Sequence, residues 1–217
     1  MPTKMPLPKR KTDKTLYFSD YPEFKPNLTP KEIFQMGSFG GTYYRPIYST
    51  INNKNYKNVH KEFEKHGWFN GLDIKTQVAS SICRPKLNYY KVKSGLSLLE
   101  WENSGWIEPV DPYGWFQWYC RFYLGRRCND DKRQVDRWNK YAGEKSGRWR
   151  RRLINMCIQK GTKYNDRIKS CFKSSRYAVC IYSLFHTEAL KKTANHTMHP
   201  WDAISILKIL KYGNIHV

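Results

Sequence analysis

The stretch "DPYGWFQWYCRFYLGRR" (residues 111–127) constrains the fold most, because it joins many aromatic rings to three arginines. Four of its rings recur at the spacing of one helical face: Trp115, Trp118, Tyr119 and Phe122. We predict a helix that Asp111 caps, that starts at Pro112 and that ends at Gly125, with Gln117 and Arg121 on the opposite face. Rings at this spacing favour a packed core over a platform for stacking bases.

Arginine is concentrated next to this helix, in "RR" (126–127) and in "RWRRR" (148–152). Guanidinium binds phosphate with two hydrogen bonds and stacks on rings, so the combination favours a nucleic-acid partner. The alternative is a solvated basic face that nearby acids partly neutralise. The predicted nucleic-acid contacts are Arg121, Arg126, Arg127, Arg148, Arg150, Arg151, Arg152, Lys9, Arg10 and Lys11.

The charge of the whole chain supports this interpretation. Lys and Arg number 39 against 18 acids, a net charge of +21. Such an excess favours polyanions, because each neutralised phosphate releases condensed counterions. We therefore predict a nucleic-acid-binding protein, with DNA favoured over RNA and contacts mainly to backbone phosphate. The alternatives are a structural component of a nucleoprotein particle and a basic protein without such a partner.

The sequence predicts an α+β fold that is mainly helical, with a small edge sheet in the N-terminal half and a helical array in the C-terminal half. Residues 1–15 form a basic, flexible arm that contains "PKRK" (8–11). A mixed region follows over 16–110 and a basic helical region over 111–217. We expect 16–217 to be one continuous globular domain.

The N-terminal elements carry clear local signals. "LTPKEIFQMG" (28–37) predicts a short helix with Thr29 as its cap, Pro30 at its first position, Glu32 completing a capping box and Gly37 as its stop. Further on, "GSFGGTYYRPIYST" (37–50) predicts a glycine turn and then an edge strand. The glycines lack the spacing of a nucleotide-binding loop, so we expect a structural turn. A second strand is predicted over 87–95.

The C-terminal half predicts further helices. One covers 130–143 and buries Val135, Trp138 and Ala142, and another covers 146–161. Together, 130–142 and 147–160 allow a helix-turn-helix, whose second helix would lead with the arginines of 148–152 into the major groove. The segment 174–192 fits a buried helix or a core strand, and 199–213 fits an amphipathic helix.

Two strings, "GSFGGTYYRPIYS" and "DPYGWFQWYCRFYLGRR", followed by "DDKRQVDRW", resemble a poorly characterised family associated with giant DNA viruses, fungi and algae. The resemblance covers roughly residues 28–152. It implies no activity, cofactor or site for this chain.

Enzymatic alternatives rest on acids and on short fragments. Glu100, Glu102, Glu108 and Asp111 lie close in sequence, and Glu102 and Asp111 are the candidates for a metal-dependent nuclease. We favour a structural role, in which these acids cap a helix and balance arginines. The fragments "DPY", "LIN" and "HP" follow the order found in uracil-DNA glycosylases, but their surroundings differ from that family's. We predict no metal and no cofactor, and favour a protein that is not an enzyme.

The N-terminus has no apolar segment typical of a secretory signal, and the longest apolar run, residues 177–185, is too short to span a bilayer. The six cysteines form no CxxC pair and no regular framework. We therefore expect no membrane partner and an intracellular location with free thiols, in the nucleus or in a viral particle or factory, rather than secretion.

Overall fold

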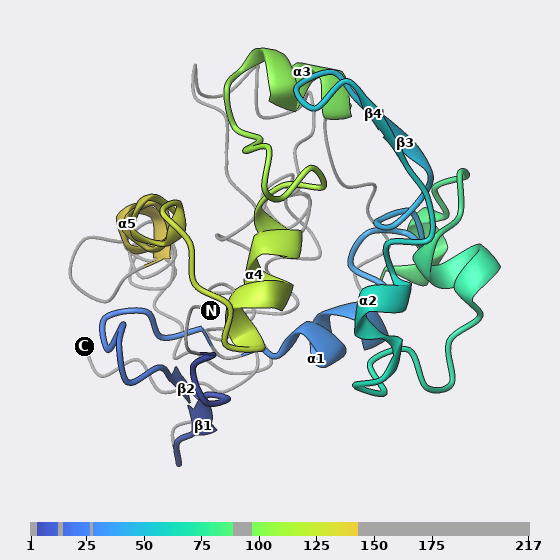
Figure 1. The fold of residues 1–217 in the computed structure, drawn as a ribbon. Coiled ribbons are helices and arrows are strands. Elements are labelled where there is room, and N and C mark those ends of the chain that lie inside the picture. The colour runs from blue at the N-terminus through green and yellow to red at the C-terminus, as the bar shows by residue number, and fades with distance from the viewer. Residues whose placement is uncertain (1–3, 13–14, 27, 89–96, 143–217) are drawn as a thin grey trace, which may run out of the picture. The chain divides into compact units, whose positions relative to one another are not determined.

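The computed structural model describes residues 4–12, 15–26, 28–88 and 97–142, and it divides into two compact units (Figure 1). The first unit consists of Met1–Met5 and Thr29–Arg127, and the second of Pro6–Leu28 and Cys128–Val217. Each unit therefore combines an N-terminal piece of the chain with a later one.

The described residues contain short helices and two antiparallel sheets of two strands each, which agrees with the predicted α+β class. The strands are β1 (Lys9–Arg10), β2 (Leu16–Tyr17), β3 (Ile47–Ser49) and β4 (Lys54–Tyr56). The α-helices are α1 (Pro30–Gln35), α2 (Lys61–Glu64), α3 (Leu98–Asn103), α4 (Trp115–Tyr123) and α5 (Asp131–Ala142). A π-helical turn, η1 (Ile74–Val78), and a 3-10 turn, η2 (Pro85–Leu87), complete the first unit.

Helix α1 confirms the sequence prediction residue by residue. The Thr29 hydroxyl accepts a hydrogen bond from the Glu32 amide (3.2 Å), and the Glu32 carboxylate accepts one from the Thr29 amide (2.8 Å). Pro30 is the first helical residue, and Gly37 follows the helix with φ of +60°. The helix packs on α4, where the rings of Phe34 and Phe116 lie 5.1 Å apart.

The strand predicted after the glycine turn is shorter than expected. Only Ile47–Ser49 pairs, with Ile47 opposite Tyr56 in β4. Tyr43 and Tyr44 lie in a turn before β3 and are both buried, whereas a strand with one face toward solvent would expose one of the two. The glycine turn itself is structural: Gly41 has φ of +87°, and a Cβ there would lie 2.2 Å from the Thr76 carbonyl oxygen.

Helix α4 confirms the aromatic core but begins later than predicted. Trp118, Tyr119 and Phe122 are fully buried. The helix starts at Trp115 rather than at Pro112, because Gly114 precedes it with φ of +82° and the Asp111 carboxylate binds arginines instead of capping. The prediction for Gln117 was wrong. This side chain is buried and its oxygen accepts a hydrogen bond from the Tyr113 amide at 3.0 Å.

The second unit has its own aromatic core. Helix α5 confirms the helix predicted over 130–143, with Val135 and Trp138 buried. The Trp138 ring meets Phe24 edge-on at 5.2 Å, and Phe24 in turn contacts Phe18 at 5.3 Å. The strand predicted over 87–95 is not found at its first residues, because Leu87 ends the 3-10 turn η2 and Asn88 caps it; its residues 89–95 lie outside the described part of the chain. The elements predicted over 146–161, 174–192 and 199–213 also lie outside it.

Candidate nucleic-acid interface

The ten predicted contact residues fall into three groups. Lys9, Arg10 and Lys11 lie on and directly after β1, in the second unit. Three more, Arg121, Arg126 and Arg127, lie on and directly after α4 in the first unit. The remaining four, Arg148, Arg150, Arg151 and Arg152, lie outside the described residues. The first two groups have different surroundings.

The β1–β2 hairpin places its basic residues at the surface. Lys9 and Arg10 are exposed, as is Lys11 directly after the strand. Lys9 pairs with Tyr17 across the ladder, and the Lys11 amide donates to the Thr15 carbonyl at 2.8 Å to close the turn. The Lys11 ammonium lies 4.5 Å from the centroid of the Tyr17 ring, a cation–π contact that orients it.

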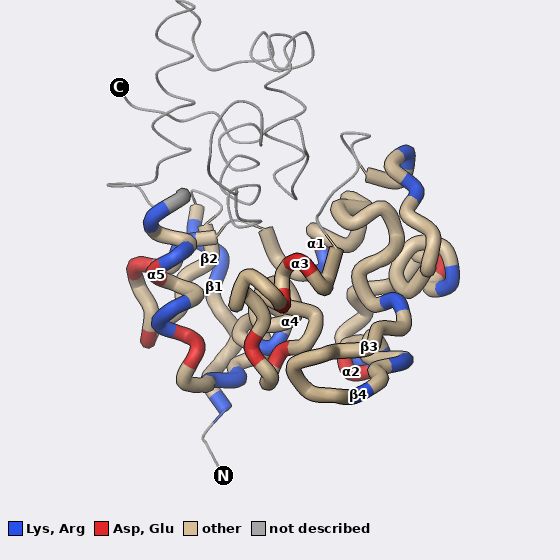
Figure 2. Tube along the Cα trace, turned by 90° about the horizontal axis from the view of Figure 1, so that it is seen from above, with Lys and Arg blue, Asp and Glu red and all other residues tan. Residues whose placement is uncertain are grey.

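The hairpin is held by the partner strand rather than by the basic one. The Leu16 amide donates to the Pro26 carbonyl at 2.7 Å, and the Leu16 side chain is 1% exposed. Phe18, directly after β2, packs on Phe24 in the core of the second unit. Figure 2 shows basic positions along β1, whereas acidic and basic positions alternate along α5. One strand of the hairpin is therefore anchored while the other presents positive charge.

The arginines of α4 are bound within their own unit instead. Asp111 is 2% exposed and accepts hydrogen bonds from Arg121 Nη1 (2.8 Å) and Arg126 Nη2 (2.6 Å). Arg121 also binds Glu62 with two hydrogen bonds, at 2.8 and 2.7 Å. These bonds join α2, the residues before α4 and the end of α4 into one charged network.

Burial and charge act in opposite directions on this network. Burial raises the pKa of Asp111 above its usual value, although Arg126 and Arg121 both act to lower it. For Arg121, burial alone would lower the pKa, but the bonds to Glu62 and the charge of Asp111 raise it above the usual value. Arg121 therefore keeps its charge, and its guanidinium is directed at carboxylates of the same unit.

Arg127 has a third kind of environment. Its guanidinium lies 3.8 Å over the Phe122 ring, and Nη1 donates to the carbonyls of Phe122 (2.9 Å) and Arg126 (2.7 Å). These carbonyls lie at and beyond the end of α4, where a cation is favourable. The three arginines are thus bonded to groups of their own unit, which gives the mixture of rings and guanidinium in residues 111–127 a structural explanation.

The carboxylates proposed for a nuclease are each bonded to other groups. Glu102 is 8% exposed and accepts hydrogen bonds from the hydroxyls of Ser49 (2.9 Å) and Thr50 (2.7 Å). Glu100 completes a capping box with Ser97 at the start of α3, and Asp111 binds the two arginines. Among the described residues, no group of three or more His, Cys, Asp or Glu side chains is placed to hold a metal ion.

Sequence reasoning missed the partner of the basic residues, Tyr17. The pattern "KRKTDKTLY" (9–17) contained the signal, because a polar turn separates basic residues from an apolar-aromatic pair that could face them in a hairpin. No helix in the described part of the chain is long and apolar enough to cross a membrane.

Comparisons with known proteins add no assignment. No family model matches the chain, and neither a curated protein nor a solved structure matches it. The resemblance of the two strings to a known family therefore stays a prediction.

Proposed function

We propose that the chain binds nucleic acid, DNA in preference to RNA, mainly through backbone phosphates. The observation that carries the proposal is the exposed basic strand of the β1–β2 hairpin, with Lys9, Arg10 and Lys11 in consecutive positions. The net charge of +21 supports it, because a polyanion offsets the repulsion that such a charge creates.

The shape of the hairpin favours duplex DNA. The major groove of B-DNA admits a two-stranded β ribbon, whereas the major groove of A-form RNA is too deep and narrow for side chains to read. In the hairpin, the Tyr17 ring restrains the Lys11 ammonium, which lowers the entropy lost when a phosphate binds. We therefore expect the basic side chains of the hairpin to contact the phosphates along the edges of the groove.

A second contact comes from the arginines of 148–152. In the proposed arrangement, α5 is the first helix of a helix-turn-helix and residues 147–160 form the second. Its leading side chains, Arg148, Arg150, Arg151 and Arg152, suit phosphates better than a base code. Phosphates also relieve the repulsion of cations gathered at a helix N-terminus.

The test is a salt titration of binding to a random-sequence duplex. The logarithm of the affinity should fall linearly with the logarithm of salt, at about −0.9 per phosphate contact and roughly −5 for a handful of contacts. A double variant, Lys9→Ala with Lys11→Ala, should reduce the magnitude of the slope by about 2.

The matched control is Lys75→Ala with Lys86→Ala, which removes the same charge from exposed positions of the first unit. It should leave the slope close to that of the unmodified chain. A slope near zero in the unmodified chain would refute phosphate binding. Equal losses in the two double variants would refute the role of the hairpin and leave only general charge attraction. A parallel titration with duplex RNA checks the preference for DNA.

A further inference from the structure

One asparagine of the sequence is followed directly by glycine, at Asn70 and Gly71. The pair occupies the centre of a β-turn, because the Leu72 amide donates to the Phe69 carbonyl at 2.9 Å. Gly71 has φ of +79°, the sign that the third position of a type II turn requires. Asn70 and Gly71 therefore lie at the tip of a tight turn.

The two groups that react when an asparagine loses its amide are both open in this turn. Asn70 and Gly71 are exposed. In the part of the chain that the structure describes, no group hydrogen-bonds the Asn70 side-chain amide or the Gly71 backbone N–H. A Cβ at Gly71 would meet no atom within 4 Å, so neighbouring segments leave space here. Glycine also lacks the side chain that would hinder an attack by its own nitrogen.

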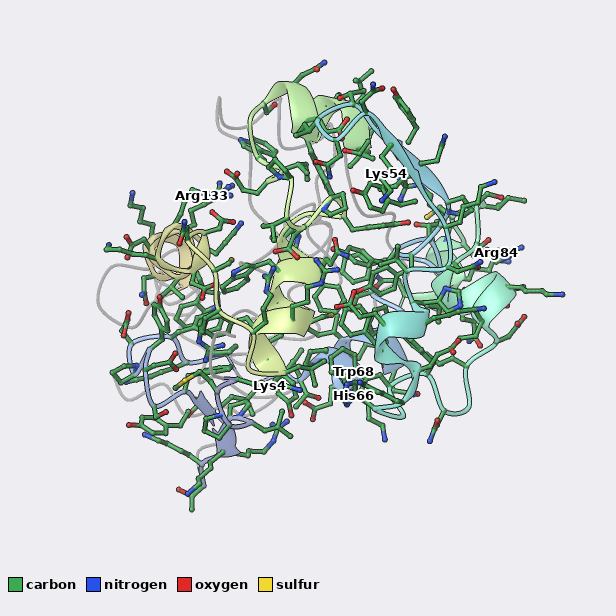
Figure 3. All side chains as sticks on the ribbon, viewed as in Figure 1. Lys4, Lys54, His66, Trp68, Arg84 and Arg133 are labelled. Atoms are coloured by element: carbon green, nitrogen blue, oxygen red, sulfur yellow. The ribbon has the colours of Figure 1, made fainter. Side chains whose placement is uncertain are left out.

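The main chain on the other side of Asn70 is held in place. Trp68 and Phe69 are buried, and the Trp68 ring lies 5.6 Å from that of His66 (Figure 3). Gln35, the last residue of α1, donates from Nε2 to the carbonyls of Trp68 (3.3 Å) and Asn70 (3.0 Å). Attack by the next backbone nitrogen requires rotation about the Asn70 Cα–C bond, which moves the Asn70 carbonyl. Gln35 therefore restrains this rotation.

We propose that Asn70 is a site of spontaneous deamidation, and that Gln35 sets its rate. The Gly71 backbone nitrogen loses its proton to solvent base and attacks Cγ of Asn70. A bond from this nitrogen to Cγ forms, the bond from Cγ to the side-chain nitrogen breaks, and ammonia leaves. Water then opens the resulting succinimide. Opening at Cγ gives aspartate, and opening at the main-chain carbonyl carbon gives isoaspartate. The reaction consumes water and requires no oxidant or reductant.

Both products change the surface of the first unit. Each places a carboxylate where the chain had a neutral amide, so each reduces the net charge of +21 by one. Isoaspartate also lengthens the main chain by one CH₂ inside the turn, between the buried Phe69 and Leu72. The Gln35 bond to the Asn70 carbonyl therefore slows a change in both charge and backbone length. The reaction needs no ligand, so it is independent of nucleic-acid binding.

The first experiment incubates the folded full chain at pH 8 and at pH 5.5. Peptide mapping by mass spectrometry follows the conversion of each amide to acid, and enzymatic methylation detects isoaspartate. Asn70 should convert, and faster at pH 8, because the attacking nitrogen reacts after losing its proton. Asn58 is the internal control: it is exposed but precedes Val59, whose branched side chain hinders ring closure. If Asn70 stays intact while the urea-unfolded chain converts it, the site is refuted.

The second experiment tests the role of Gln35. Gln35→Ala removes the bond to the Asn70 carbonyl and should increase the conversion rate of Asn70 toward that of the urea-unfolded chain. The matched control, Lys31→Ala, changes an exposed residue of the same helix and should keep the rate of the unmodified chain. Thermal melting checks that both variants are folded. Equal rates in Gln35→Ala and the unmodified chain would show that Gln35 does not restrain the reaction.

Discussion

Substituting Glu102 distinguishes a structural carboxylate from a catalytic one. Glu102 lies on α3, and its carboxylate is bonded to β3 and the turn that follows. One oxygen, Oε1, accepts from the Ser49 hydroxyl (2.9 Å) and the Thr50 amide (3.2 Å). The other, Oε2, accepts from the Thr50 hydroxyl at 2.7 Å. We expect Glu102→Gln to destabilise the chain without removing any catalytic step.

The magnitude follows from these bonds. Hydrogen bonds to a charged group contribute about 1.5–3 kcal/mol each, against about 1 kcal/mol for neutral ones. Glutamine keeps one acceptor oxygen, and the hydrogen bonds that remain are between neutral groups. Its amide NH₂ replaces the other oxygen and faces a hydrogen-bond donor, although the Thr50 hydroxyl can rotate to accept from it. The expected loss is about 2–3 kcal/mol in the free energy of unfolding. In urea this lowers the midpoint by about 1 M.

The matched control is Glu100→Gln, the same substitution two residues away on the same helix. Glu100 is exposed and completes the capping box with Ser97, a position at which glutamine also serves. We expect a change of less than about 0.5 kcal/mol. Urea unfolding of the full chain, followed by fluorescence and circular dichroism, gives both values.

A nuclease would behave differently. Labelled single- and double-stranded DNA and RNA should stay intact with the unmodified chain, with or without magnesium or manganese. If the unmodified chain cuts and Glu102→Gln abolishes cutting while its urea midpoint stays unchanged, Glu102 is catalytic and the structural argument is wrong.

Three further predictions concern the core, the charged network and the arginine segment. Trp118→Ala should cost about 3–5 kcal/mol in stability by thermal melting, and unchanged melting with weaker binding would instead show that the ring stacks on bases. Because burial raises the folded-state pKa of Asp111, its contribution to stability is full below the usual aspartate pKa and is lost as the pH rises through the raised value. The urea midpoint of Asp111→Asn, measured relative to that of the unmodified chain, should therefore increase as the pH rises. A difference between the two midpoints that stays constant with pH would contradict this direction. Replacing Arg151 and Arg152 by Ala should weaken duplex binding by about 1–3 kcal/mol per arginine, measured by anisotropy, and unchanged affinity would exclude both from the interface.

The parts of the fold that the sequence predicted correctly depend on neighbouring residues. The capping box, the leading proline and the stopping glycine of α1 all lie within ten positions, so each signal acts on the same turn of chain. The buried stripe of α4 also follows from spacing within one helix. Local patterns of this kind carry their own physical cause.

The features that the sequence did not indicate depend on distant residues. Gln117 is buried beside Tyr43, whose hydroxyl accepts a hydrogen bond from the Gln117 amide across 74 positions of sequence. Arg121 faces Glu62, which lies 59 positions earlier. No periodicity within residues 111–127 indicates either partner. For the candidate interface, sequence could identify basic residues but could not separate the exposed Lys9 from arginines that bind their own unit.

The way the chain alternates between the two units has a consequence for synthesis on the ribosome. Residues 6–28 leave the ribosome early, but helix α5, whose Trp138 meets Phe24, emerges more than a hundred positions later. The amide of Met5 likewise finds the Gly125 carbonyl only after α4 is complete. Neither unit can therefore finish folding before the other has begun to be made. A stop after Arg127 would leave Phe24 with Phe18 but without Trp138, and a single protease cut at this point would leave pieces of both units on the N-terminal fragment.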